Sequence, residues 1–290
     1  MATPVSVAAR ASAWLFRPVA AGRVAWLRTF LYLFVVADLF VLRPWVADNG
    51  AIPPDLYQPL FVGRALPFPT PTELVVAVVR YALAASALVA ASGRLVRSAG
   101  VVVFVLYFQW MLVAFSYGKV DHDRVAFLVA LAVLPTVGRA RWGDRTPTEA
   151  AGWAVRCVQV AVVATYFLSA FAKFRYGGVD WATGATLMRA VLRRGTWLAE
   201  PLEDLPAVLG AAQWGLLAFE LATPLMLTGG RVARAFLVTA LAFHVVTYAA
   251  IEILFWPHVM CLLAFAPLER IPVPAWLDRV APARASPAST

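Results

Sequence analysis

The fold of this chain is decided by the stretch Ser98-Ala-Gly-Val-Val-Val-Phe-Val-Leu-Tyr-Phe-Gln-Trp-Met-Leu-Val-Ala-Phe-Ser-Tyr117, in which none of the 20 residues is charged. An α-helix needs about 20 predominantly apolar residues to cross the hydrocarbon core of a bilayer. In lipid the backbone must satisfy its own hydrogen bonds, which a helix does within one segment. The stretch therefore predicts a transmembrane helix.

The same length criterion, applied to the rest of the chain, gives about eight spans. They cover residues 24–42, 72–92, 98–117, 124–136, 150–173, 206–228, 232–251 and 253–267. Two of them are weak candidates for a full crossing. The span 124–136 is short, and the span 253–267 follows its predecessor almost without a loop and contains Pro257. Either one is expected to be tilted, re-entrant or broken.

The composition agrees with a membrane protein and excludes an ordinary soluble domain. Hydrophobic residues make up 62% of the chain and charged residues 14%, so the sequence lacks the polar surface that water requires. The net charge of +9 does not indicate a nucleic-acid partner, because the basic residues form short clusters between apolar runs. We predict an all-α, polytopic transmembrane helical bundle of about eight helices, with the lipid bilayer as its partner.

The distribution of arginine predicts the topology, since cytoplasmic loops carry an excess of Lys and Arg. It places both termini in the cytoplasm and predicts a multi-pass protein of the cell membrane. Residues 1–20 form a cytoplasmic N-terminal segment, 21–268 the transmembrane domain and 269–290 a disordered cytoplasmic tail. The segment 180–194 has the apolar spacing of an amphipathic helix, and we expect it to lie flat on the outer interface.

Ionisable side chains within or at the ends of spans are functional candidates, because burying a charge in lipid is costly. Those within spans are Arg28, Asp38, Arg80, Arg156, Glu220 and His244; those at outer ends are His122, Lys173, Glu252 and His258. Cys157 and Cys261 lie in apolar runs without CxxC spacing, which argues against a dithiol centre. No metal site is predicted, and a haem is only weakly indicated because CxxCH is missing.

Lys173 has two interpretations. It is either an interfacial lysine that extends its amine toward water, or a general base, since an amine kept from water more easily stays neutral and accepts a proton. His122 lies at the same predicted depth and is either a solvated loop histidine or the group that orients the Lys173 amine. Glu220 and His244 lie mid-span, and we expect them to pair across a helix interface rather than to take part directly in catalysis.

Three stretches carry a resemblance to a known family. They are Asp121-His122 running into the apolar run that ends at Pro135; Tyr166 to Lys173 followed by Asp180-Trp181; and Phe219-Glu220 to Arg231 followed by His244. In order and spacing, from about residue 20 to 268, they resemble the HTTM domain family, the membrane domain of vitamin K-dependent γ-carboxylase.

The resemblance implies a mechanism and a cofactor. A lysine at the position of Lys173, beside a histidine at that of His122, would deprotonate reduced vitamin K or menaquinol. Oxygen would then add, and the resulting base would remove a γ-proton from a peptide glutamate, which captures carbon dioxide. We expect Lys173 and His122 as catalytic residues, and Tyr166, Trp181, His244 and Glu220 as cofactor-binding residues. The implied partners are a quinone and a secreted peptide or a partner membrane protein.

Two other function classes stay open. The chain could be a non-catalytic membrane subunit of a redox or protein-maturation complex, in which the ionisable groups only support helix packing. It could also be a small-solute transporter, in which Arg28, Arg80 and Glu220 line a path.

Overall fold

The protein is helical throughout most of its length. The computed structural model describes residues 6–118 and 120–274. Helix makes up 75% of the structure, which confirms the all-α class. In the described residues, extended structure is confined to β1 (Val19–Ala20) and β2 (Pro147–Thr148), which pair antiparallel. Residues 1–5 and most of the predicted tail, 275–290, lie outside the described residues.

The chain divides into two compact units. The first is Met1–Val158 with Ala266–Thr290, and the second is Gln159–Phe265. Several of the helices of the first unit, between β1 and β2, are only one turn long. The first unit contains α1 (Val7–Leu15), α2 (Ala21–Ala37), η1 (Asp38–Leu42), η2 (Pro44–Ala51), η3 (Pro54–Leu56), α3 (Phe61–Arg64), α4 (Glu73–Ala91), α5 (Ser98–Phe115), η4 (His122–Arg124), α6 (Val125–Val133), η5 (Leu134–Thr136) and η9 (Leu268–Arg270).

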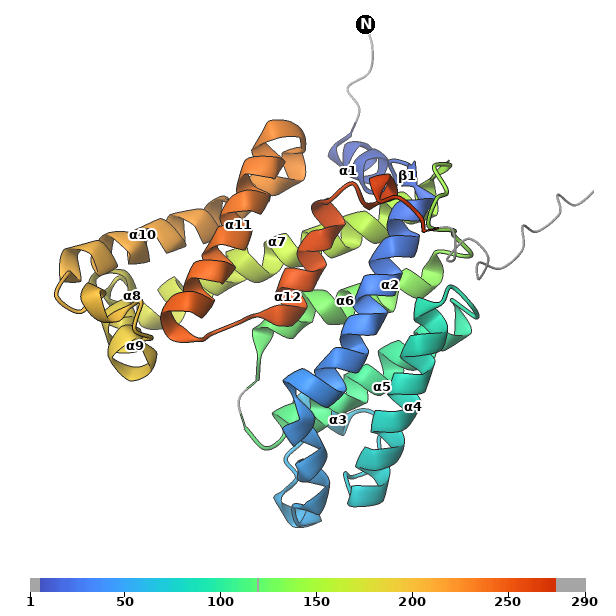
Figure 1. The fold of residues 1–290 in the computed structure, drawn as a ribbon, viewed down its shortest axis with the longest axis horizontal. Helices are drawn as coiled ribbons and strands as arrows, with labels where there is room; N and C mark the ends of the chain where they lie inside the picture. The colour runs from blue at the N-terminus through green and yellow to red at the C-terminus, as the bar shows by residue number, and fades with distance from the viewer. Residues whose placement is uncertain (1–5, 119, 275–290) are drawn as a thin grey trace, which may run out of the picture. The chain divides into compact units, whose positions relative to one another are not determined.

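α7 (Glu149–Gly177) begins in the first unit and ends in the second. The second unit continues with α8 (Asp180–Thr183), α9 (Thr186–Arg194), η6 (Glu200–Leu202), α10 (Pro206–Ala222), η7 (Thr223–Thr228), α11 (Gly230–Ile251), α12 (Trp256–Cys261) and η8 (Leu262–Phe265). Figure 1 labels the α-helices of both units along the chain.

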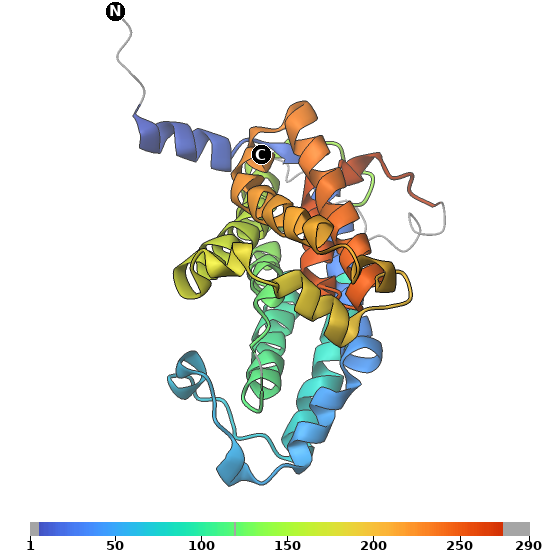
Figure 2. The same ribbon diagram turned by 90° about the vertical axis from the view of Figure 1, so that its left-hand side faces the viewer.

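Long apolar helices build the first unit. α4 lies beside both α2 and α5, and α6 packs on α5 (Figure 1). α4 begins where the sequence signals a helix start, since the Thr72 side chain accepts a hydrogen bond from Val75 N–H at 3.3 Å. Leu31, Leu83 and Trp110 are fully buried and belong to the core of this unit. The connection between η1 and α4, light blue in Figure 2, carries η2, η3 and α3.

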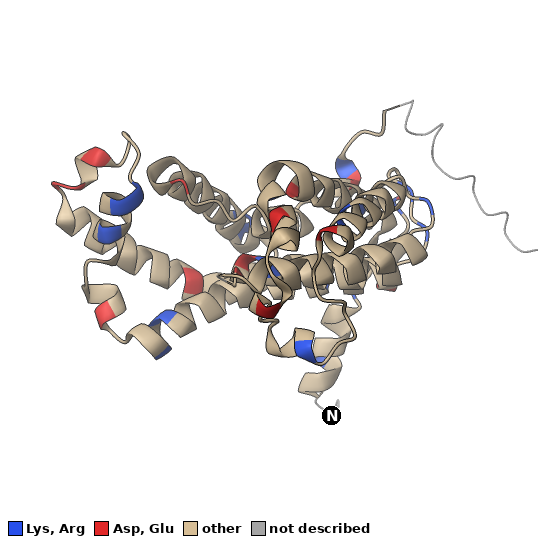
Figure 3. Ribbon diagram, turned by 90° about the horizontal axis from the view of Figure 1, so that it is seen from below, with Lys and Arg blue, Asp and Glu red and all other residues tan. Residues whose placement is uncertain are grey.

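Six helices in the described residues are long and apolar enough to cross a membrane. They are Ala21–Leu42, Glu73–Ala91, Ser98–Phe115, Glu149–Gly177, Pro206–Thr228 and Gly230–Ile251. Figure 3 shows that acidic and basic residues occupy only scattered positions of the ribbon, most of which is tan. In the most apolar part of Gly230–Ile251 only 11% of the residues are buried, so this helix exposes an apolar surface that lipid would cover.

Six of the about eight predicted spans thus correspond to helices of membrane-spanning length in the described residues. The fourth expected span, 124–136, forms the nine-residue α6 and one further turn, because Pro135 lies in η5 and ends the α-helix there. The eighth expected span, 253–267, contains only the short apolar helix Trp256–Phe265. These are the two segments whose length or proline content already argued against a full crossing.

The predicted helix over 180–194 is interrupted. Gly184 separates α8 from α9, and a Cβ at this position would lie 2.6 Å from the carbonyl oxygen of Asp180, so only glycine fits the turn. α9 keeps the predicted amphipathic character. Its Val191 is buried, whereas Arg189, Arg193 and Arg194 are exposed.

The beginning of the predicted tail is tied to the first unit. Glu269 in η9 accepts hydrogen bonds from the Arg23 guanidinium at 2.7 and 2.8 Å. This bond to Arg23 lowers the pKa of the Glu269 carboxyl below its ordinary value, against a smaller opposing effect of burial. Residues 269 and 270 therefore belong to the folded domain rather than to a disordered segment.

Glu269 should make the stability of the protein depend on pH. Because its pKa is lowered on folding, its contribution is present above the unfolded pKa of about 4.3 and is lost as the pH falls through the folded pKa. Between pH about 6 and about 3 the wild type should thus lose more thermal stability than Glu269→Gln. Melting temperatures of both proteins in detergent would test this. The exposed Asp55→Asn serves as a control, and identical pH profiles for the wild type and Glu269→Gln would contradict the prediction.

Candidate functional site

An ion pair joins α7 to α10. The amine Nζ of Lys173 lies 2.5 Å from Oε1 of Glu220, and the side chains are only 19% and 6% exposed. The ring of Trp181 lies alongside, with its centroid 4.9 Å from the same nitrogen. The pair thus joins a part-buried cation to a buried anion, with an aromatic face next to the cation, an arrangement that favours the charged amine.

Packing holds these three residues in place. Ala170 of α7, Ala182 of α8 and Leu217 of α10 form one buried cluster, and Trp181 packs against it. Small residues at the contact allow helices to approach closely, which brings Lys173 within reach of Glu220.

A second polar contact lies on the same face of α7. The hydroxyl of Tyr166 is 2.7 Å from Nε2 of His244 on α11. The His258 ring of α12 meets the Tyr166 ring edge-on at 4.4 Å between centroids. Phe219 and Phe243 surround these groups, and His244 and His258 are 3% and 2% exposed. These aromatic rings keep the polar groups away from water.

The two contacts belong to one cluster. Tyr166 precedes Lys173 by seven residues, about two helical turns, so both side chains lie on one face of α7. Tyr166 also interacts electrostatically with Glu220. We name this the α7 cluster, and it consists of Lys173, Glu220, Trp181, Tyr166 and His244. The structure thus brings together five of the six residues that the sequence analysis selected, all within the second unit.

His122, the sixth, belongs to the first unit, where it begins η4. Its neighbour Asp121 forms an ion pair with Arg43. Burial raises the pKa of Asp123, the next residue, while Arg124 opposes that effect. Since His122 and Lys173 belong to different units, the predicted contact between them stays a prediction.

The prediction that Glu220 pairs with His244 is wrong, because each of them has another partner. Glu220 pairs with Lys173 and His244 with Tyr166, because both residues on α7 extend toward the helices that carry them. The expectation of a helix-interface contact holds for each residue separately.

Gln213 was not selected from the sequence, and His258 was selected only as an ionisable residue at the end of a span. Nε2 of Gln213 lies 2.5, 2.9 and 3.1 Å from the carbonyl oxygens of Trp181, Ala182 and Gly184, and thereby fixes the turn that carries Trp181. The signal for Gln213 is present in the sequence, since an uncharged amide within a span also needs partners. His258 was identified at the end of a span, but only its packing on Tyr166 connects it to the cluster.

A separate buried charge cluster lies in the first unit. Nη1 and Nη2 of Arg124 bind the Asp38 carboxylate at 2.5 and 2.9 Å, and the Tyr107 hydroxyl donates to the same carboxylate at 3.0 Å. Burial opposes the charge of Arg124, but Tyr107 and Asp38 outweigh it and raise the pKa of Arg124 above its ordinary value. Each group has a partner of complementary charge or hydrogen-bonding capacity, which is typical of a structural clamp.

The residues that the transporter interpretation placed on one path have separate local partners. Arg28 donates to the carbonyl oxygens of Val137 and Gly138, Arg80 donates to that of Leu39, and Glu220 binds Lys173. Within residues 6–118 and 120–274, no three His, Cys, Asp or Glu side chains come close enough together to hold a metal ion.

Comparisons of the chain with protein-family models, with curated proteins and with solved structures found no match.

Proposed function

We propose that this chain is an integral membrane protein that takes a proton from a lipid-soluble hydroquinone at the α7 cluster. The observation that supports the proposal is the Lys173–Glu220 ion pair, in which Glu220 is buried and Lys173 part-buried, between two helices of membrane-spanning length. The proposed setting is the cell membrane, with both termini in the cytoplasm and the cluster toward the outer leaflet, as the arginine distribution predicts.

The residues of the cluster suit the chemistry of such a ligand. A reduced quinone supplies an aromatic ring and phenolic protons, and it reaches its site through the bilayer. Trp181 offers an aromatic face next to the ion pair. Glu220 offers a carboxylate that accepts a proton, and the Lys173 ammonium stabilises the negative oxygen that remains.

The charges of the pair balance in this step. Before it, one ammonium and one carboxylate cancel each other; after it, the pair holds one more proton and carries a net positive charge beside the phenolate. If the proton resides on Glu220, Lys173 stays an ammonium throughout. Tyr166 and His244 extend the cluster by a hydrogen bond along which the proton can leave. In the proposal, molecular oxygen then adds to the deprotonated quinol and oxidises it, and the resulting base removes a γ-proton from a peptide glutamate, which captures carbon dioxide, as the family resemblance implies.

The test uses purified protein in nanodiscs with menaquinol or reduced vitamin K. Wild type should bind the quinol, oxidise it and incorporate labelled carbon dioxide into a Glu-containing peptide. Lys173→Ala should keep quinol binding within a few-fold but lose turnover by about 10²–10⁴-fold. Arg175→Ala is the matched control, because Arg175 is an exposed basic residue two positions further along α7 and should be dispensable.

The outcomes separate the rival functions. Quinol binding without product from either protein would favour the accessory subunit of a redox or maturation complex. Failure of the wild type to bind either quinol would refute the proposal.

A further inference from the structure

Arg28 is a buried cation without an anion. Its side chain is 1% exposed within α2, and Nη1 donates to the carbonyl oxygens of Val137 and Gly138 at 3.2 and 3.1 Å. Nη2 is buried and has no hydrogen-bond partner, and no carboxylate in the described part of the chain pairs with this guanidinium. By contrast, the buried Arg124 has the carboxylate of Asp38. A buried charge left without a counter-ion destabilises the fold unless a ligand supplies one.

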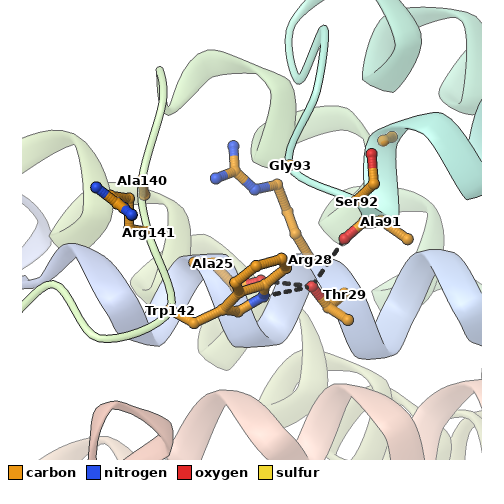
Figure 4. A pocket seen from close by; sticks show the side chains of 10 residues that line it. Ala25, Arg28, Thr29, Ala91, Ser92, Gly93, Ala140, Arg141 and Trp142 are labelled. Atoms are coloured by element: carbon orange, nitrogen blue, oxygen red, sulfur yellow. Dashed lines mark hydrogen bonds between the residues drawn. The ribbon is translucent and has the colours of Figure 1, made fainter. Parts of the chain in front are cut away.

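Arg28 lines a small pocket at one end of α2 and α4, within the first unit. Figure 4 shows its guanidinium reaching between the Ala140–Arg141 segment and the turn at Gly93. Arg141 also lines this pocket, and none of the lining residues is acidic. This end of α2 and α4 is the end that carries arginine-rich loops and that the sequence assigns to the cytoplasmic side.

The other polar groups of the wall are already engaged. Nε1 of Trp142 donates to Oγ1 of Thr29 at 2.9 Å, and that oxygen lies 3.0 Å from the carbonyl of Ala91. The hydroxyl of Ser92 donates to the carbonyl of Val89 at 2.7 Å. The hydroxyl and indole groups that line the pocket are therefore already hydrogen-bonded, whereas Nη2 of Arg28 is not.

The size of the recess restricts the ligand. Its volume of about 10 Å³ accommodates about one water-sized atom. A ligand must therefore insert one oxygen toward Arg28 and keep the rest of its bulk outside, near Arg141. A phosphate group meets this requirement, since guanidinium groups bind its oxygens with matching geometry and its other substituents can point outward.

We propose that Arg28 and Arg141 bind a phosphate oxyanion, with the headgroup of an anionic phospholipid as its source. Basic pockets between transmembrane helices on the cytoplasmic side are suited to such headgroups. The lipid's acyl chains can extend along α2 and α4 while the phosphate neutralises the Arg28 guanidinium. Inorganic phosphate shares this chemistry and is the second possible source.

The test measures binding to delipidated protein in detergent by native mass spectrometry, with phosphatidylglycerol, phosphatidylcholine and inorganic phosphate as separate probes. Wild type should retain phosphatidylglycerol about tenfold more tightly than phosphatidylcholine, and Arg28→Gln should abolish that preference. Arg141→Gln should weaken phosphatidylglycerol binding several-fold. Since Arg141 donates no hydrogen bond within the described residues, this variant should fold even if Arg28→Gln does not.

Arg80→Gln is the matched control. Arg80 is a half-buried arginine of the same unit that already donates to Leu39 and stacks on Phe40, so its loss should leave lipid retention unchanged. Arg28-dependent binding of inorganic phosphate without a lipid preference would identify the free ion as the source. Unchanged phosphatidylglycerol retention in Arg141→Gln and in folded Arg28→Gln would overturn the proposal.

Discussion

Replacing Arg124 with leucine is expected to lower the free energy of unfolding by about 3–5 kcal/mol, a large part of the roughly 5–15 kcal/mol that is typical of a folded protein. The reason is the Asp38 carboxylate, which is fully buried and binds both Nη atoms of Arg124. Without the guanidinium, Asp38 is left with the single hydrogen bond from Tyr107. Chemical denaturation in mild detergent, followed by circular dichroism, measures the loss.

A triple variant separates lost charge pairing from lost packing. In Asp38→Leu/Tyr107→Phe/Arg124→Met, every polar member of the cluster is replaced by an apolar side chain, so no unpaired charge stays buried. Stability should return to near the wild-type level, since apolar replacement of a whole buried ionic cluster is often neutral or stabilising. If Arg124→Leu alone were as stable as the wild type, the cluster would not be the clamp described above.

The second large effect concerns turnover at the α7 cluster. Lys173→Met and Glu220→Leu should each lower quinol turnover by about 10²–10⁴-fold. Because the proposal treats the two residues as one proton-accepting pair, the double variant should be no slower than the slower single variant. Initial rates of quinol oxidation in nanodiscs give all four values of this double-mutant cycle.

Stability measured on the same four proteins distinguishes catalysis from folding. Each single variant leaves one charge of the pair without its partner, whereas the double variant leaves none. The double variant should therefore recover stability but not turnover. Recovery of both would show that the pair only holds α7 to α10, and additive losses of turnover would show that the residues act independently.

The positions of the long helices could be predicted from sequence, because span length and apolar composition act locally. The span 150–173 corresponds to α7 and the span 232–251 to α11, with ends displaced by a few residues. Proline and segment length also identified the two spans that do not form full crossings. The break at Gly184 was missed, because the helical spacing of its neighbours says nothing of how closely the Asp180 carbonyl approaches this residue.

The candidate site was predictable as a set of residues but not as a set of partners. The cost of ionisable groups in lipid selected Lys173, Glu220 and His244 individually. Which of them pair depends on how the helices are rotated about their axes, and hydropathy carries little information on rotation. The heptad spacing of Tyr166 and Lys173 was the one available indication that they share a face of α7.

The largely exposed surface of α11 affects how firmly this helix is fixed within the second unit. With 11% of its most apolar stretch buried, the helix contacts the rest of its unit mainly along the face that carries Phe243 and His244. At its start, Gly229 and Gly230 adopt φ of +80° and +64°, in a turn whose glycine positions have open space around them. In a bilayer, lipid would contact the rest of the α11 surface, so the bilayer thickness would affect the tilt of this helix.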